Sequence, residues 1–198
     1  MTLKNYTKPD PHILLYNRIE FKLYAASYYL DQIREFQKDH AGINDDMKSV
    51  HMEIAIDGFL AQLYGALDAL FILINEKLNL ELSLDQVNSK TVKTKLESIG
   101  KGDLLFEWDI AKQEGHWLHD LSEFRHQIVH RERLRRMREY DPINNEAIQY
   151  ISSKQRKINF NPSDYMPFDM IKYFESSFDN VTDLINTIRA KDTALQLK

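Results

Sequence analysis

A run of apolar side chains at helical spacing, from residue 52 to residue 78, leaves this chain few folds other than a helical bundle. The residues recur at steps of three or four: Met52, Ile56, Phe59, Leu63, Ala66, Leu70, Ile74 and Leu78. This spacing places them on one face of an α-helix. Leu60, Leu67 and Phe71 widen that face, which predicts a central helix with neighbours on more than one side.

The middle of this run, residues 55–74, approaches the length of a membrane-spanning helix. It contains Asp57, Gln62 and Asp68, and charged side chains near the centre of a bilayer are costly. The sequence therefore predicts a buried bundle helix and no membrane contact. The polar opening residues also lack the pattern of a secretory signal, so a cytoplasmic protein is the expectation.

Other segments repeat the helical pattern, and only 6 Gly and 5 Pro interrupt the chain. The predicted further helices cover about residues 12–39, 89–98, 104–110 and 164–190. A last helix of the bundle passes through Leu121, Phe124 and Ile128 and is ended by Asp141-Pro142. Residues 148–151 and 157–160 instead favour two short strands. We expect a single domain over residues 1–198, with its core at about 12–138. Its fold class is all-α, an up-and-down multi-helix bundle with a small β-hairpin near 147–160 and a C-terminal helix in the region 141–190.

Cysteine is absent from all 198 residues. Disulfides, thiolate zinc sites and cysteine nucleophiles are therefore excluded.

The arginines are concentrated in one place although the net charge is −4. Five of the ten lie in a single eight-residue run: Arg131, Arg133, Arg135, Arg136 and Arg138. A local cationic patch on an acidic protein is able to bind phosphate. The alternative is a solvated helix end whose cations complement the helix dipole.

Four of the seven histidines lie between residues 116 and 130. On a helical wheel Leu121, Phe124 and Ile128 share one side, which predicts the face that packs on the core. The opposite side carries His119, Glu123, His126 and His130. This histidine face should point away from the core, where either solvent or a second copy of the protein covers it.

The segment Arg125-His126-x-x-x-His130 resembles the catalytic motif of the HEPN superfamily. That motif is an arginine, usually followed by Asn, Asp or His, with a histidine four to six residues after the arginine. The helix layout from about 45 to 138 is also similar to that family.

The resemblance implies a metal-independent endoribonuclease that acts on RNA, needs no cofactor, and forms a homodimer in which motifs from both subunits meet in one cleft. Some HEPN relatives act only as RNA- or nucleotide-binding or protein-interaction modules, which is the alternative function. The family spans toxin–antitoxin pairs, phage defence and RNA processing. An antitoxin is therefore a candidate partner.

The chemistry assigns each motif residue a role. RNA cleavage without metal needs a base for the ribose 2′-OH, an acid for the leaving 5′-oxygen, and a cation for the charged phosphorane. His130 is the predicted acid/base residue, and Arg125 is the predicted phosphate-binding residue. His126 is the predicted orienting residue. Asp68 and Glu123 are candidate supporting carboxylates.

Arg125 and His130 lie about 140° apart on one helix, so a single helix does not easily bring them together. A two-fold interface would present both motifs near the symmetry axis. The arginine run at 131–138 would then line the mouth of the cleft and bind the RNA backbone.

Two other interpretations of the histidine segment remain open. Arg125 and the histidines could be ordinary surface residues that pair with Asp120 and Glu123. The spacing of His116, His119, Glu123, His126 and His130 also resembles a set of metal ligands. Iron and manganese sites in bundles use inward-facing carboxylates from several helices, so we expect no metal and treat a histidine-rich metal-binding protein as the third choice.

Overall fold

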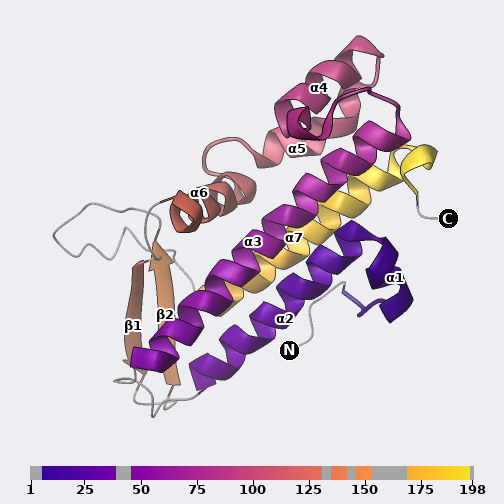
Figure 1. The fold of residues 1–198 in the computed structure, drawn as a ribbon. Helices are drawn as coiled ribbons and strands as arrows, with labels where there is room; N and C mark the ends of the chain where they lie inside the picture. The colour runs from indigo at the N-terminus through magenta and orange to yellow at the C-terminus, as the bar shows by residue number, and fades with distance from the viewer. Residues whose placement is uncertain (1–5, 39–45, 131–134, 142–145, 153–168, 197–198) are drawn as a thin grey trace.

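A computed structural model describes residues 6–38, 46–130, 135–141, 146–152 and 169–196. Figure 1 shows the helices α1 (Pro11–Tyr16), α2 (Arg18–Lys38), α3 (Asp46–Lys77), α4 (Ser89–Ser98), α5 (Phe106–Ala111), α6 (Trp117–His130) and α7 (Met170–Ala190). Single 3₁₀ turns cover Leu84–Gln86, Gly102–Leu105 and Thr193–Leu195. The two strands are β1 (Arg135–Asp141) and β2 (Glu146–Ser152). The all-α bundle with a small hairpin predicted from the sequence is confirmed.

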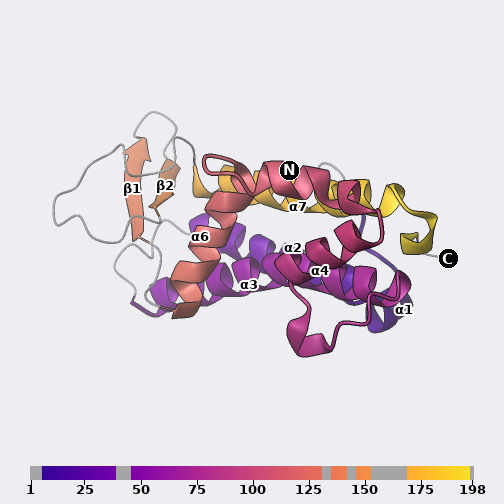
Figure 2. The ribbon, with the colours of Figure 1, turned by 90° about the horizontal axis from the view of Figure 1, so that it is seen from above.

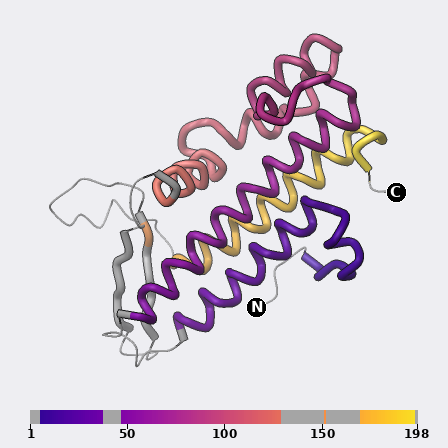
Figure 3. Tube along the Cα trace, viewed as in Figure 1, coloured from indigo at the N-terminus to yellow at the C-terminus, as the bar shows by residue number. Residues whose placement is uncertain are grey.

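Three long helices, α2, α3 and α7, run beside one another, as the tube in Figure 3 shows. Helices α4, α5 and α6 cover another side of α3 (Figures 1 and 2). Side chains that α3 contributes to the core, such as Phe59, Leu63 and Leu70, have no exposed surface. The predicted central position of this helix is therefore confirmed.

Helix α3 also has the length and composition of a membrane span. Among the described residues, one helical segment, Met47–Lys77, is long and apolar enough to cross a membrane. Half of its most apolar 18-residue stretch is buried inside the protein. The apolar face is occupied by α2, α6 and α7. Its hydrophobicity is therefore accounted for by packing inside the bundle.

Aromatic pairs join the helices around α3. Phe59 on α3 contacts Phe174 on α7 with ring centroids 4.8 Å apart, and Phe71 contacts Trp108 on α5 at 4.7 Å. Phe124 on α6 meets Tyr173 on α7 edge to face at 5.2 Å. Such pairs add packing energy beyond that of area burial, so they fix where α6 lies on the bundle.

A small residue lets α2 and α3 approach closely. A Cβ atom at Gly58 would lie 2.6 Å from the ring of Tyr29 on α2, a distance that side chains do not tolerate. Any larger residue at Gly58 would separate the two helices or displace the ring.

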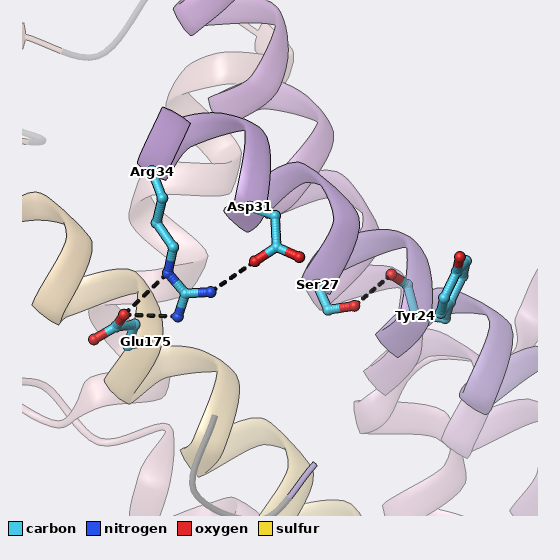
Figure 4. A network of polar contacts seen from close by, with 5 residues as sticks. All are labelled: Tyr24, Ser27, Asp31, Arg34 and Glu175. Carbon is cyan, nitrogen blue, oxygen red and sulfur yellow. Dashed lines mark hydrogen bonds and ion pairs between the residues drawn. The ribbon is translucent and has the colours of Figure 1, made fainter. Parts of the chain in front are cut away.

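An ion pair joins α2 to α7 (Figure 4). The Nε and Nη2 atoms of Arg34 donate to Oε1 of Glu175 at 3.1 and 2.7 Å, and Nη1 donates to Asp31 at 2.7 Å. Arg34 and Glu175 expose 18% and 20% of their side chains. Because Arg34 and Glu175 are partly buried, their ion pair should contribute more to the stability of the fold than the exposed contact with Asp31.

The hairpin differs from the prediction in its position. Strands β1 and β2 pair antiparallel, with Met137 opposite Tyr150. The predicted strand at 148–151 lies inside β2, but its partner precedes it in the chain instead of following it. The predicted strand at 157–160 lies outside the described residues.

The last bundle helix was predicted to continue to Asp141-Pro142, which is wrong, because α6 is Trp117–His130 and β1 begins at Arg135. Arg135, Arg136 and Arg138 belong to β1. Arginine has a high helix propensity, and pairing with a strand more distant in the sequence overrides that local preference. Arg135, Arg136 and Arg138 are therefore strand residues and not the end of a helix.

Candidate active site on helix α6

Helix α6 is amphipathic. Leu118, Leu121 and Phe124 are buried against the bundle, whereas Glu123 and His126 are exposed on the opposite side. His116, just before the helix, is also exposed, and His119 is half-buried. The prediction that this face points away from the core is confirmed for Glu123 and His126. His130 is the last residue of α6, and its side chain lies outside the described part of the structure.

Arg125 stacks on an aromatic ring of the central helix. Its guanidinium carbon lies 4.8 Å from the ring centroid of Tyr64, and the residue is half-buried. Within the described residues it makes no hydrogen bond or ion pair. Stacking therefore positions the guanidinium while its five N–H donors remain available to a ligand.

Asp68 lies one turn beyond Tyr64 on the same face of α3. Burial raises the pKa of its carboxyl group above 3.8, and the positive charges of Arg125, Lys22 and Lys112 act in the opposite direction. The structure thus places Asp68 near Arg125, as a supporting carboxylate would require. Glu123, the other candidate, is exposed on α6.

Lys112 was not identified from the sequence. It caps the C-terminus of α5, and its Nζ donates to Ser122 Oγ at 2.7 Å and to the Tyr64 hydroxyl at 3.3 Å. Ser122 in turn donates to the carbonyl of Leu118 at 2.7 Å. No motif signals this arrangement, because residues 64, 112 and 122 meet only through the tertiary fold.

Lys22 adds a third cation from α2. Its Nζ donates to Oε1 of Gln62 on α3 at 2.9 Å. Burial lowers the pKa of Lys22, Arg18 lowers it further, and Asp68 raises it. We call the group Lys22, Tyr64, Asp68, Lys112, Ser122 and Arg125 the Tyr64 cluster.

The structure describes the predicted RNA-binding arginines only in part. Arg131 and Arg133 lie outside the described residues. Arg135, Arg136 and Arg138 lie on β1, and their side chains are not described. The predicted lining of a cleft by these arginines therefore stays a prediction.

The metal alternative has no assembled ligand set in the part of the chain that the structure describes. There, no three His, Asp or Glu side chains are grouped so that they could hold a metal ion. The Nδ1 atom of His119 lies 3.6 Å from the carboxylate of the neighbouring Asp120.

A comparison with protein families agrees with the fold. A family model described as HEPN_Cthe2314-like HEPN matches residues 14–189, a range that runs from α1 to the last turn of α7. No curated protein and no solved structure matches the chain significantly.

Proposed function

This chain belongs to the HEPN_Cthe2314-like HEPN family, and we propose that it is a metal-independent endoribonuclease. HEPN domains commonly cleave RNA or bind nucleotides, and the residues of α6 favour cleavage. The observation that carries the proposal is the placement of Arg125. A half-buried guanidinium stacked on Tyr64, with no hydrogen bond to any described residue, is ready to bind a phosphate through two parallel N–H donors.

The proposed reaction is an internal transesterification. A histidine takes the proton of a ribose 2′-OH, and the 2′-oxygen attacks the adjacent phosphorus. The bond from phosphorus to the 5′-oxygen breaks as a second acid protonates that oxygen, which leaves a 2′,3′-cyclic phosphate and a 5′-hydroxyl. His130 serves as the acid/base residue, His126 orients it, and Arg125 stabilises the charge on the phosphorane.

We propose that a second copy completes the site. Base and acid need two groups on opposite sides of the phosphorus, and one α6 helix supplies one His130. An isologous interface through the exposed face of α6, which carries His126, would present both motifs to one cleft. The measured oligomeric state tests this point: a monomer that cleaves RNA at full rate when highly diluted would contradict the composite site.

The chemistry is tested by incubating the purified protein with a mixed-sequence RNA in EDTA. The proposal predicts cleavage that EDTA leaves unchanged and products that end in a 2′,3′-cyclic phosphate. The same RNA with 2′-O-methyl groups should resist cleavage, because it has no 2′-OH to attack. Cleavage that requires added metal, or that proceeds on the methylated RNA, would refute the mechanism. Tight RNA binding without any cleavage would favour the non-catalytic module.

A further inference from the structure

We propose that Lys112 is a second phosphate-binding residue, which holds the RNA phosphate next to the one on Arg125. The proposal rests on the proposed function in taking RNA as the ligand and Arg125 as a phosphate-binding residue. Three observations support it: how Lys112 is held, where it lies relative to Arg125, and the charge around both.

Lys112 is fixed by two acceptors and retains a donor. An ammonium group has three N–H donors, and Lys112 uses two of them on Ser122 Oγ and the Tyr64 hydroxyl. Ser122 directs its own proton to the Leu118 carbonyl, so its oxygen is available as an acceptor for Lys112. Within the described residues Lys112 has no third acceptor. Its remaining N–H is therefore held in place for a ligand.

Lys112 and Arg125 lie at the same ring. The Lys112 Nζ is 5.8 Å from the centroid of Tyr64 and the Arg125 guanidinium carbon is 4.8 Å from it. Ser122, which binds Lys112, and Arg125 are three residues apart on α6 and so share one face of that helix. The two cations are therefore neighbours, and their chemistry is complementary: Arg125 offers a planar fork and Lys112 a point charge.

The charges of the Tyr64 cluster do not balance. Lys22, Lys112 and Arg125 all act on the one carboxylate of Asp68. All three cations are half-buried, where electrostatic interactions are stronger than in open water. An anionic ligand would complete the pairing, and a polyanion that supplies two phosphates suits a group with this excess. The feature is local, because the chain as a whole has a net charge of −4.

The test measures binding of a 2′-O-methyl oligonucleotide, which the proposed enzyme cannot cleave. Fluorescence anisotropy gives its affinity between about 50 and 200 mM salt, where single-stranded binding weakens with a slope of roughly −0.7 per phosphate contact. Lys112→Ala should reduce the steepness of that slope by about 0.7. Lys112→Arg should keep the slope, because it retains the charge. Lys93→Ala is the matched control, since Lys93 is a partly exposed lysine that pairs with Asp109 on α5.

Several results of the binding experiment would overturn the proposal. An unchanged slope in Lys112→Ala, or an equal loss in Lys93→Ala, overturns the proposal, as does a wild-type protein that does not bind the oligonucleotide. Binding of adenosine monophosphate that depends on Lys112, without binding of the oligonucleotide, would assign the residue to a mononucleotide and overturn the RNA assignment.

Thermal melting identifies a variant that fails to fold, and Tyr64→Phe then provides a second test. It removes the hydroxyl that Lys112 binds and keeps both the ring for Arg125 and the charge of Lys112. Tyr64→Phe should therefore weaken binding of the oligonucleotide while the salt slope stays close to that of the wild type. Wild-type affinity in a folded Tyr64→Phe protein, together with a misfolded Lys112→Ala, would count against the proposal. Failure of the proposed function would give a different result. Ordinary RNA would then not be cleaved, while the salt slope would still depend on Lys112.

Discussion

The stacking of Arg125 on Tyr64 should appear as a coupling between the two residues in the free energy of unfolding. The perturbation is a double-mutant cycle with Tyr64→Leu, Arg125→Met and both together. Leucine and methionine retain much of the apolar contact of the native side chains and remove the ring and the charge. The cycle isolates the pair because other contacts of each residue, such as the bond from Lys112 to Tyr64, cancel in the difference.

The expected coupling is about 1 kcal/mol. A cation over an aromatic face contributes roughly 0.5–1 kcal/mol at exposed positions and about 2 kcal/mol when desolvated. Arg125 is half-buried and its guanidinium carbon is 4.8 Å from the ring centroid, which places the pair between these limits. Lys112 lies farther from the same centroid, at 5.8 Å, so it should couple to the ring less strongly through stacking.

The assay is urea unfolding of the four proteins, followed by circular dichroism of the helices. A control cycle combines Tyr64→Leu with Glu123→Gln in place of Arg125→Met, because Glu123 is an exposed residue of the same helix. The control coupling should be near zero. A coupling near zero for Tyr64 and Arg125, or one of equal size in the control, would show that the ring does not hold the guanidinium.

Two further predictions concern charges elsewhere in the bundle. Asp68→Asn should stabilise the protein at neutral pH: folding raises the carboxyl pKa above 3.8, so the ionised form costs the folded state stability above that pH. The gain should be fully present above the raised pKa and should disappear as the pH falls through that pKa towards 3.8. Urea unfolding at several pH values would reveal an incorrect sign. Glu175→Gln should cost about 1–3 kcal/mol because it weakens the hydrogen bonds to half-buried Arg34, whereas Asp31→Asn, at an exposed position, should cost under about 0.5 kcal/mol. Equal losses in these two variants would contradict the ranking.

Much of the fold follows from the sequence because local periodicity determines it. The apolar steps between Met52 and Leu78 predict α3, which the structure gives as Asp46–Lys77. The repeat ending at Ile188 predicts α7 in the same way. These helices are long and each buries a broad face, so their pattern is hard to read as another element.

The hairpin could not be placed in this way. Arg135, Arg136 and Arg138 suit a helix locally, but in the structure they pair with Ser152, Ile151 and Gln149 of β2. Strand pairing depends on a partner elsewhere in the chain, and the local pattern carries little information on which segment that is. The prediction therefore extended the helix and moved the hairpin too far along the chain.

The candidate site was predicted in part for a similar reason. Arg125 and His126 stand out because the motif lies within one helix, and Asp68 was only a weaker candidate. Lys112 and Tyr64 carry no motif, since their relation to Arg125 arises when α3, α5 and α6 pack together. Contacts of this kind follow from the tertiary structure and not from spacing in the sequence.

The most direct measurement is the single-turnover rate of RNA cleavage in EDTA by His130→Ala and His116→Ala. His116 is an exposed histidine just before α6 and outside the motif. Loss of a general acid/base should slow His130→Ala by about 10²–10⁴-fold, while His116→Ala should cleave at the wild-type rate. Equal rates for the two folded variants would contradict the assignment of RNA cleavage to the Arg125–His130 motif.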